Sequence, residues 1–197
     1  MTQKTKRGFF LKGGIGVMKV KLPAEEFYHL INHGPCVLIT SGSKGIKNVA
    51  PIAWVTAVND EPPLVAACIS SAHYTAELID KYKEFVINIP SVELLEVVEV
   101  TGKVSGRKVD KFKLAKIITP EDGVKVNVVH IKECIGFIEA EVCDCKEYGG
   151  VKLYIGKVLH CEVEDSVYDK YLIIEKAKTF HHLGGNKFCI SGKEVKI

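Results

Sequence analysis

Short runs of apolar residues recur along the chain, and turn-forming residues separate them. Such runs are typical of buried strands. The run at residues 49–58 is long enough to bend at Pro51 and still form one strand. Two longer stretches in the second half are joined by a turn at residues 148–150, which predicts a long hairpin. The predicted strands are residues 36–41, 49–58, 64–69, 84–89, 135–145 and 151–163.

Helical periodicity is confined to short segments. In residues 22–31 the side chains of Phe27, Leu30 and Ile31 fall on one helical face behind Pro23, which suits the start of a helix. Two further helices are predicted, one capped by Thr75 and reaching about Tyr82, and one beginning at Ser91.

The predicted strands outnumber the helices and follow one another through short turns. This pattern favours an antiparallel barrel or sandwich over a doubly wound sheet. The chain contains no G-x-G-x-x-G after a strand and no G-x-x-x-x-G-K-[ST], which argues against a dinucleotide-binding Rossmann site and against a P-loop. The expected fold is mainly β with short helices, in the α+β class.

Composition narrows the class of protein. The chain has 197 residues, of which 47% are hydrophobic and 26% are charged, as in globular domains that bury a core. Its longest apolar stretch, residues 49–58, is too short for a membrane span of about 20 residues. The net charge of +3 is spread among acidic residues, so no basic stripe predicts nucleic-acid binding. We expect one domain at residues 19–197, preceded by an extension at residues 1–18 that resembles an export signal only faintly.

The chain has seven cysteines, an odd number that lies mostly in apolar segments. Free thiols in a reducing, cytoplasmic compartment are therefore expected. Cys143 and Cys145 would share a face if the strand is regular, and Cys161 follows His160, so a metal site or thiol-redox centre is an alternative. Alternatively, these cysteines are scattered buried residues that form neither a metal site nor a redox centre.

Three segments carry candidate binding chemistry. Ser70, Ser71, His73 and Thr75 lie in a turn before a helix, where hydroxyls and free N–H groups can bind an anion, with His73 adding charge. A plain helix cap is the alternative for this turn.

The other two segments surround the first in sequence. Trp54, the one tryptophan, follows Pro51 in an apolar run and is either a wall for a flat ligand or a core residue. The polar segment at residues 101–111 predicts a surface loop that would suit a phosphate or a hydroxyl-rich ligand, or is simply solvated.

Taken in order, these segments resemble the flavin reductase-like, FMN-binding split-barrel family, especially its flavoredoxin and ferric-reductase-like branch. The likeness extends from about Leu22 to Phe188. It rests on residues 35–40 (PCVLIT), 48–56 (NVAPIAWVT), 60–65 (DEPPLV) with 73–79 (HYTAELI), 84–90 (EFVINIP) and 105–112 (SGRKVDKF), with 155–158 (IGKV) and 182–186 (HLGGN) in support.

The resemblance implies an antiparallel Greek-key split β-barrel that holds FMN at a homodimer interface. It implies that Ala53, Trp54 and Val55 contact the isoalloxazine ring, and that Asn88 lies near it. The phosphate end would be held by Ser70, His73, Tyr74 and Thr75. The loop residues Ser105, Gly106, Arg107 and Lys108 would close over the ring or phosphate.

The resemblance also implies an oxidoreductase or electron carrier in which the flavin carries the chemistry, with no catalytic side chain of its own. Many NAD(P)H-using relatives have Gly-Asp-His before the last long strand, where this chain has Gly149, Gly150 and Val151. A redox partner protein of the ferredoxin type is therefore expected ahead of NAD(P)H. A split-barrel module that binds another ligand, such as haem, without catalysis is a further alternative.

Overall fold

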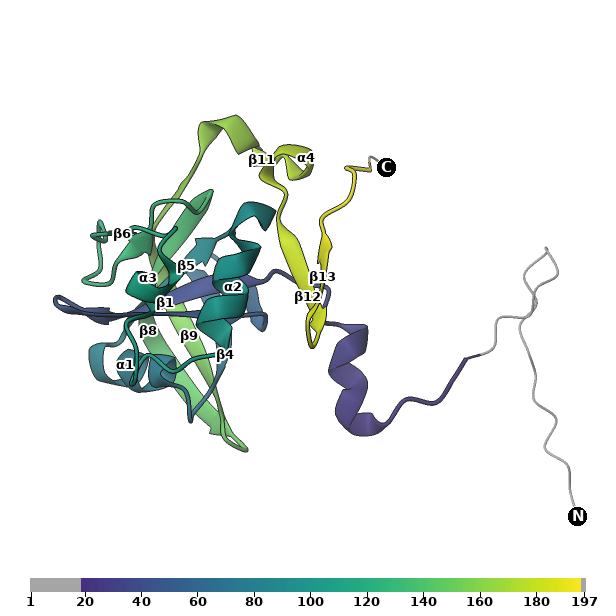
Figure 1. The fold of residues 1–197 in the computed structure, drawn as a ribbon, viewed down its shortest axis with the longest axis horizontal. Helices are drawn as coiled ribbons and strands as arrows, with labels where there is room; N and C mark the ends of the chain where they lie inside the picture. Colours follow the sequence, from purple (N-terminus) through teal and green to yellow (C-terminus); the bar gives the residue numbers. More distant parts are fainter. Residues whose placement is uncertain (1–18, 196–197) are drawn as a thin grey trace, which may run out of the picture.

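The computed structural model describes residues 19–195, so the predicted extension at residues 1–18 lies outside the described residues. Seven antiparallel strands form one sheet in the order β2-β1-β5-β8-β9-β4-β3 (Figure 1). They are β1 (Val37–Ser43), β2 (Ile46–Ile52), β3 (Val55–Asp60), β4 (Pro63–Ser70), β5 (Glu84–Ile89), β8 (Gly136–Tyr148) and β9 (Val151–Val163). The mainly β, antiparallel architecture predicted from the sequence is confirmed.

Short elements surround this sheet. The paired minor strands are β6 (Pro120–Glu121) with β7 (His130–Ile131), β10 (Tyr168–Asp169) with β11 (Tyr171–Leu172), and β12 (Phe180–Gly184) with β13 (Lys187–Ile190). The helices are η1 (Ala24–Leu30), α1 (Tyr74–Tyr82), η2 (Val92–Leu94), α2 (Leu95–Gly102), α3 (Lys111–Ala115), η3 (Asp165–Val167) and α4 (Ile174–Ala177). None of the helices within residues 19–195 has the length and apolar character of a membrane span.

The two edges of the sheet are consecutive in the chain. Strands β2 and β3 lie at opposite ends of the strand order, yet only Ala53 and Trp54 connect them. The three Cα–Cα steps from Ile52 to Val55 span at most about 11 Å, so the sheet has to curl until its edges approach each other at this point. We call this junction the seam. The predicted single strand at residues 49–58 is therefore wrong, because the chain leaves one edge at Ile52 and enters the other at Val55.

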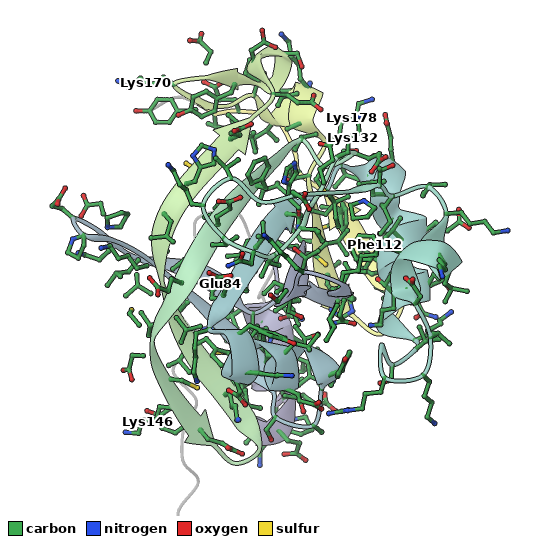
Figure 2. The ribbon with its side chains drawn as sticks, turned by 90° about the vertical axis from the view of Figure 1, so that its left-hand side faces the viewer. Glu84, Phe112, Lys132, Lys146, Lys170 and Lys178 are labelled. Carbon is green, nitrogen blue, oxygen red and sulfur yellow. The ribbon has the colours of Figure 1, made fainter. Side chains whose placement is uncertain are left out.

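Two apolar clusters fill the molecule. One lies inside the curled sheet and includes Ile39, Phe85 and Tyr154, all at most 1% exposed. The other lies between the sheet and α2 and α3, where Phe112 packs with Leu38 and Val98 (Figure 2). The second cluster holds the helices that form one wall of the site described below.

Two details near the helices differ from the sequence-based expectation. The N-cap of α1 is His73, whereas Thr75 lies one residue inside the helix with its side chain buried. In η1 the predicted apolar face does not pack inward: Phe27, Leu30 and Ile31 are 57%, 69% and 65% exposed. The packing of one chain leaves this face uncovered.

A β-bulge changes the expected placement of the paired cysteines in the long hairpin. The register of β8 on β9 shifts between Val142 and Asp144, so the alternation on which a shared face depends is broken there. Cys145 lies opposite Tyr154, while the thiol of Cys143 is 3.3 Å from the carbonyl oxygen of Ile155.

Candidate functional site

A polar cavity of about 320 Å³ lies where α1 begins, beside β2, the end of α2 and the following loop. The loop at residues 103–110 covers it, and α3 begins at its floor. Six of the residues that the sequence singled out line this cavity: His73, Tyr74, Thr75, Ser105, Gly106 and Arg107. Segments about 30 residues apart in the chain therefore meet around one space.

Thr75 and Asn48 form the buried wall of the polar cavity. Asn48 Nδ2 donates to Thr75 Oγ1 at 2.9 Å, and both residues are at most 2% exposed. Because Thr75 Oγ1 accepts there, its O–H remains available to donate toward the cavity. Asn48 Oδ1 is buried without a partner among the described residues, which is an unusual state for a native polar atom.

Gly106 allows the covering loop to lie directly on Asn48. A Cβ at this position would stand 2.2 Å from Asn48 Oδ1 and 2.9 Å from the ring of Tyr74. Contacts this short do not occur with a side chain present, so the close approach requires glycine. The loop residue that the sequence assigned to ligand binding is thus needed for the shape of the cavity.

Arg107 anchors the same loop on α1. Its guanidinium donates from Nε and Nη2 to Glu77 Oε2 at 3.0 and 2.8 Å, and from Nη1 to the carbonyl oxygen of Ala72 at 3.0 Å. The guanidinium carbon also lies 5.4 Å from the centre of the Tyr74 ring. Most of its donors are therefore occupied by protein atoms, and Arg107 mainly positions the loop.

Lys111 supplies the buried positive charge. The residue is 6% exposed, and its Nζ donates to the carbonyl oxygen of Thr101 at 2.7 Å. Burial lowers the pKa of this lysine to about 8, so it is still mostly protonated at neutral pH. One protein acceptor leaves part of the ammonium free to bind an anion in the polar cavity.

His73 behaves differently from the expectation that it adds positive charge. Burial, followed by the charges of Lys111 and Arg107, lowers the pKa of the imidazole. A lowered pKa keeps His73 neutral at physiological pH. The buried cation of the cavity is consequently Lys111, which lies in the polar segment that the sequence singled out, while Lys103 and Arg107 line the cavity with more exposed side chains.

A signal for Lys111 was present in the sequence. Asp110 is the N-cap of α3, and its Oδ1 accepts from the backbone N–H groups of Phe112 and Lys113 at 3.1 and 3.2 Å. An Asp followed by a short apolar helix indicates such a cap. That pattern places Lys111 in the first turn beside the buried Phe112, instead of on a solvated loop.

An apolar cavity of about 590 Å³ adjoins the polar cavity, and the two share Pro51, Gly102 and Lys103. Its walls come from the seam, from α2 and from the β12–β13 hairpin, and Figure 1 shows α2 between the sheet and that hairpin. Leu95, Val98 and Phe188 contribute apolar surface, and Ala53 lies at the seam. The adjoining cavities suit a ligand with an anionic end and a flat apolar body.

The backbone of β2 borders both cavities. This strand pairs with β1 on one side and has no strand partner on the other within the described part of the chain. The backbone groups on this outer edge of β2 have no strand partner there and are open for hydrogen bonds to a ligand edge.

Trp54 and Val55 line a separate groove of about 340 Å³ with Phe27, Tyr28 and Ile31. Trp54 is 46% exposed, so it is not a core residue, and its Nε1 donates to Asn32 Oδ1 at 3.0 Å. Ala53 lines both this groove and the apolar cavity.

The remaining predicted residues, Ser70, Lys108 and Asn88, line neither the polar nor the apolar cavity. Ser70 shapes the turn before α1, where its carbonyl oxygen accepts from the N–H of His73 at 3.0 Å. Lys108 lines a shallow hollow on the outer side of Gly106. Asn88 is fully buried between β1 and β7, donating to the carbonyl oxygen of Leu38 and accepting from the N–H of Ile131, and it lines neither cavity.

The cysteines offer no comparable site. All seven are free thiols. Within residues 19–195, no three His, Cys, Asp or Glu side chains converge where they could hold a metal ion. Cys161 lines a different apolar cavity from the one described above, together with Phe137 and Phe180.

Comparison with known proteins assigns the fold and the family. The family model described as "Flavin reductase like domain" matches residues 30–182. An uncharacterized protein of Pyrococcus abyssi is 37% identical over 145 residues, covering 73% of this chain and 82% of that protein.

Among solved structures, flavoredoxin from Methanosarcina acetivorans matches with a TM-score of 0.81 and 24% identity, over 92% of this chain and 95% of its own. Nitrilotriacetate monooxygenase component B from Bacillus cereus matches with a TM-score of 0.80 and 20% identity, over 93% and 100%. These likenesses confirm the predicted split-barrel fold.

The lowered pKa of Lys111 predicts a specific pH dependence of stability. The ordinary pKa of a lysine is 10.5, so between about pH 8 and 10.5 the unfolded chain binds more protons than the folded one. The free energy of unfolding should therefore gain a rising contribution over this range. In Lys111→Met that contribution should vanish, which urea unfolding at pH 7.5 and pH 10 in phosphate-free buffer would measure.

Lys113→Met is the matched control, because the side chain of Lys113 on the same helix is 86% exposed. Its stability should follow that of the native chain at both pH values. If native and Lys111→Met unfolding change in parallel with pH, the lysine is not held in a buried site.

Proposed function

The chain belongs to the flavin reductase-like domain family, and from this membership we propose that it is an FMN-binding oxidoreductase or electron carrier. The observation that carries the proposal is the pair of adjoining cavities, one with a buried lysine and the other with a mostly apolar lining. FMN has the matching form, because a phosphate with about two negative charges is tied to a flat ring system.

The polar cavity fits the phosphate end of FMN. The Lys111 ammonium and the Thr75 hydroxyl are donors there, and the first N–H groups of α1 have no partner within the helix. The unpartnered Asn48 Oδ1 fits the ribityl chain, whose hydroxyls are donors. The neutral His73 can donate a hydrogen bond without adding charge.

The apolar cavity fits the ring. Pro51, Leu95, Val98 and Phe188 would exclude water from it, and the open edge of β2 would meet its polar rim. A bound flavin supplies the redox chemistry, while the protein supplies binding, orientation and electrostatics. The seven free thiols further support a reducing compartment, and we place the protein in the cytoplasm.

The electron donor that this site favours is a protein of the ferredoxin type. NAD(P)H-using relatives are expected to carry a histidine at the turn between β8 and β9, where this chain has Gly149 and Gly150 with φ of +55° and +87°. The carbonyl oxygen of Gly150 accepts from the N–H and the hydroxyl of Ser71 at 2.9 and 3.0 Å. This turn is thus held by hydrogen bonds from Ser71, and it contains no histidine side chain.

A homodimer would cover the exposed face of η1. Phe27, Leu30 and Ile31 lie beside the groove of Trp54, and this groove meets the apolar cavity at Ala53. A short helix with no buried residue gains little stability from its own chain. A second copy seated on this face would bury it and border the flavin site.

The phosphate assignment predicts a difference between two ligands. Thr75→Val and Lys111→Met should each weaken FMN binding by about 1.5–3 kcal/mol, the value of a hydrogen bond to a charged group, which is roughly 10- to 150-fold in Kd. Riboflavin, which lacks the phosphate, should bind these variants and the native chain equally. Titration followed by flavin fluorescence measures both, with Lys113→Met as the unaffected control.

Equal losses for FMN and riboflavin would place the phosphate elsewhere. A native chain that binds neither ligand would refute the proposed function as a whole.

The donor assignment predicts the outcome of anaerobic reduction. Reduced ferredoxin should bleach the flavin absorbance of the FMN-loaded protein faster than NADH or NADPH at the same concentration. Free FMN mixed with each donor corrects for direct reduction. Faster bleaching by either nicotinamide would identify a nicotinamide enzyme instead.

The dimer assignment predicts that Ile31→Glu shifts the protein from the mass of two chains to that of one, because a carboxylate is costly inside an apolar interface. Light scattering during size-exclusion chromatography measures the mass, and FMN affinity should fall in the same variant. Val124→Glu is the control, since this 52% exposed residue follows β6, which lies far from η1 in Figure 1. A native chain that elutes as a monomer with bound FMN would contradict the assignment.

A further inference from the structure

Two adjacent histidines of β12 face different cavities. The imidazole of His181 has partners at both nitrogens, the carbonyl oxygen of Gly34 at 2.8 Å and the hydroxyl of Ser191 at 3.2 Å. His182 lines the apolar cavity, and its Nε2 lies 2.9 Å from the carbonyl oxygen of Gly185. Among residues 19–195, Nδ1 of His182 has no hydrogen-bond partner.

The contact with Gly185 determines which nitrogen of His182 exchanges protons. A carbonyl oxygen only accepts, so Nε2 has to carry the hydrogen of this bond. In that tautomer Nδ1 carries the lone pair of the ring. The ring is further held by Phe188, whose centre lies 5.0 Å away. The structure thus presents a positioned imidazole with one free nitrogen at the wall of the apolar cavity.

The other titratable groups around this wall are less suited to proton transfer near neutral pH. Lys103 is paired with Glu99 on α2, and Glu96 is an exposed carboxylate. Burial raises the pKa of the Cys36 thiol to about 12. His29 of η1 packs against the turn at Gly184, on the outer side of the hairpin.

The lining of the apolar cavity also restricts which second substrate can be reduced there. Its lining is mostly apolar, and its charged groups are two carboxylates and one ammonium. A polyanionic second substrate is disfavoured there, whereas a neutral planar molecule can lie against a flat ring. At about 590 Å³ the chamber falls within the roughly 300–1,000 Å³ of small-molecule sites.

We propose that His182 is a catalytic acid that donates a proton from Nδ1 to a quinone reduced in the apolar cavity. The proposal rests on the proposed flavin function. Reduction of a quinone to a hydroquinone takes two electrons and two protons. The reduced flavin, itself reduced by the ferredoxin-type donor, supplies both electrons and one proton. His182 supplies the second proton: its Nδ1–H bond breaks, an O–H bond forms on the quinone, and solvent reprotonates the imidazole.

The kinetic test compares two acceptors. FMN-loaded protein reduced with dithionite is mixed anaerobically with menadione, a neutral quinone, or with ferricyanide, which takes one electron and no proton. His182→Gln should lower the menadione rate about 100-fold, within the range of general acid catalysis, and leave the ferricyanide rate unchanged. The native menadione rate should fall as pH rises, and the variant rate should not.

His181→Gln is the matched control, and both of its rates should equal those of the native protein. Equal menadione rates in the native chain and His182→Gln would overturn the proposal. A parallel loss with ferricyanide would overturn it too, because it would indicate a disturbed flavin site.

A second readout does not depend on turnover. Nitrogen-15 NMR of the imidazoles in oxidised, FMN-loaded protein should show His182 with its proton on Nε2 at alkaline pH. Addition of menadione should shift the His182 resonances and leave those of His181 in place. A proton on Nδ1, or unshifted His182 resonances when menadione perturbs the flavin absorbance, would overturn the proposal. Absence of FMN binding would instead refute the proposed function, and this inference with it.

Discussion

The seam between β2 and β3 is the constraint on which the rest of the molecule depends. Two residues join the opposite edges of a seven-stranded sheet, so the sheet has to curl into a barrel. The junction cannot continue the ladder, and the outer edge of β2 is left without a strand partner in the described chain. The short connection therefore closes the barrel and also leaves the backbone edge of β2 available to a ligand. Both cavities lie along that edge.

The buried charge at the floor of the site depends on packing around it. Lys111 is held between the carbonyl oxygen of Thr101 and the cap of α3, while Arg107 ties the covering loop to Glu77. A charge in such a place costs solvation free energy unless it is paired, which is why its pKa is lowered. An anion bound there would relieve that cost. The same arrangement lowers the pKa of His73, so burial makes one residue the cation and its neighbour a neutral donor.

Much of this architecture could be read from local patterns. The strand β5 and the long β8–β9 hairpin were predicted close to their observed bounds, because apolar residues recur along them and turn-forming residues separate them. Residues 73–75 and 105–107 were singled out as candidate binding segments, and they line one cavity. The break after Ile52 was not predicted, because apolar residues continue through it. The bulge beside Cys143 was not predicted either, because it depends on how β8 aligns with β9.

The sequence by itself determined the fold class, the family and the two segments that form the polar cavity, since each of these follows from residue types and their order. Only the tertiary structure decided which side chains carry charge in that cavity, which face of η1 stays exposed, and which of His181 and His182 has a free nitrogen. The reason is physical. Burial, register and hydrogen-bond partners are set by segments that are far apart in the chain, and pKa values follow from burial.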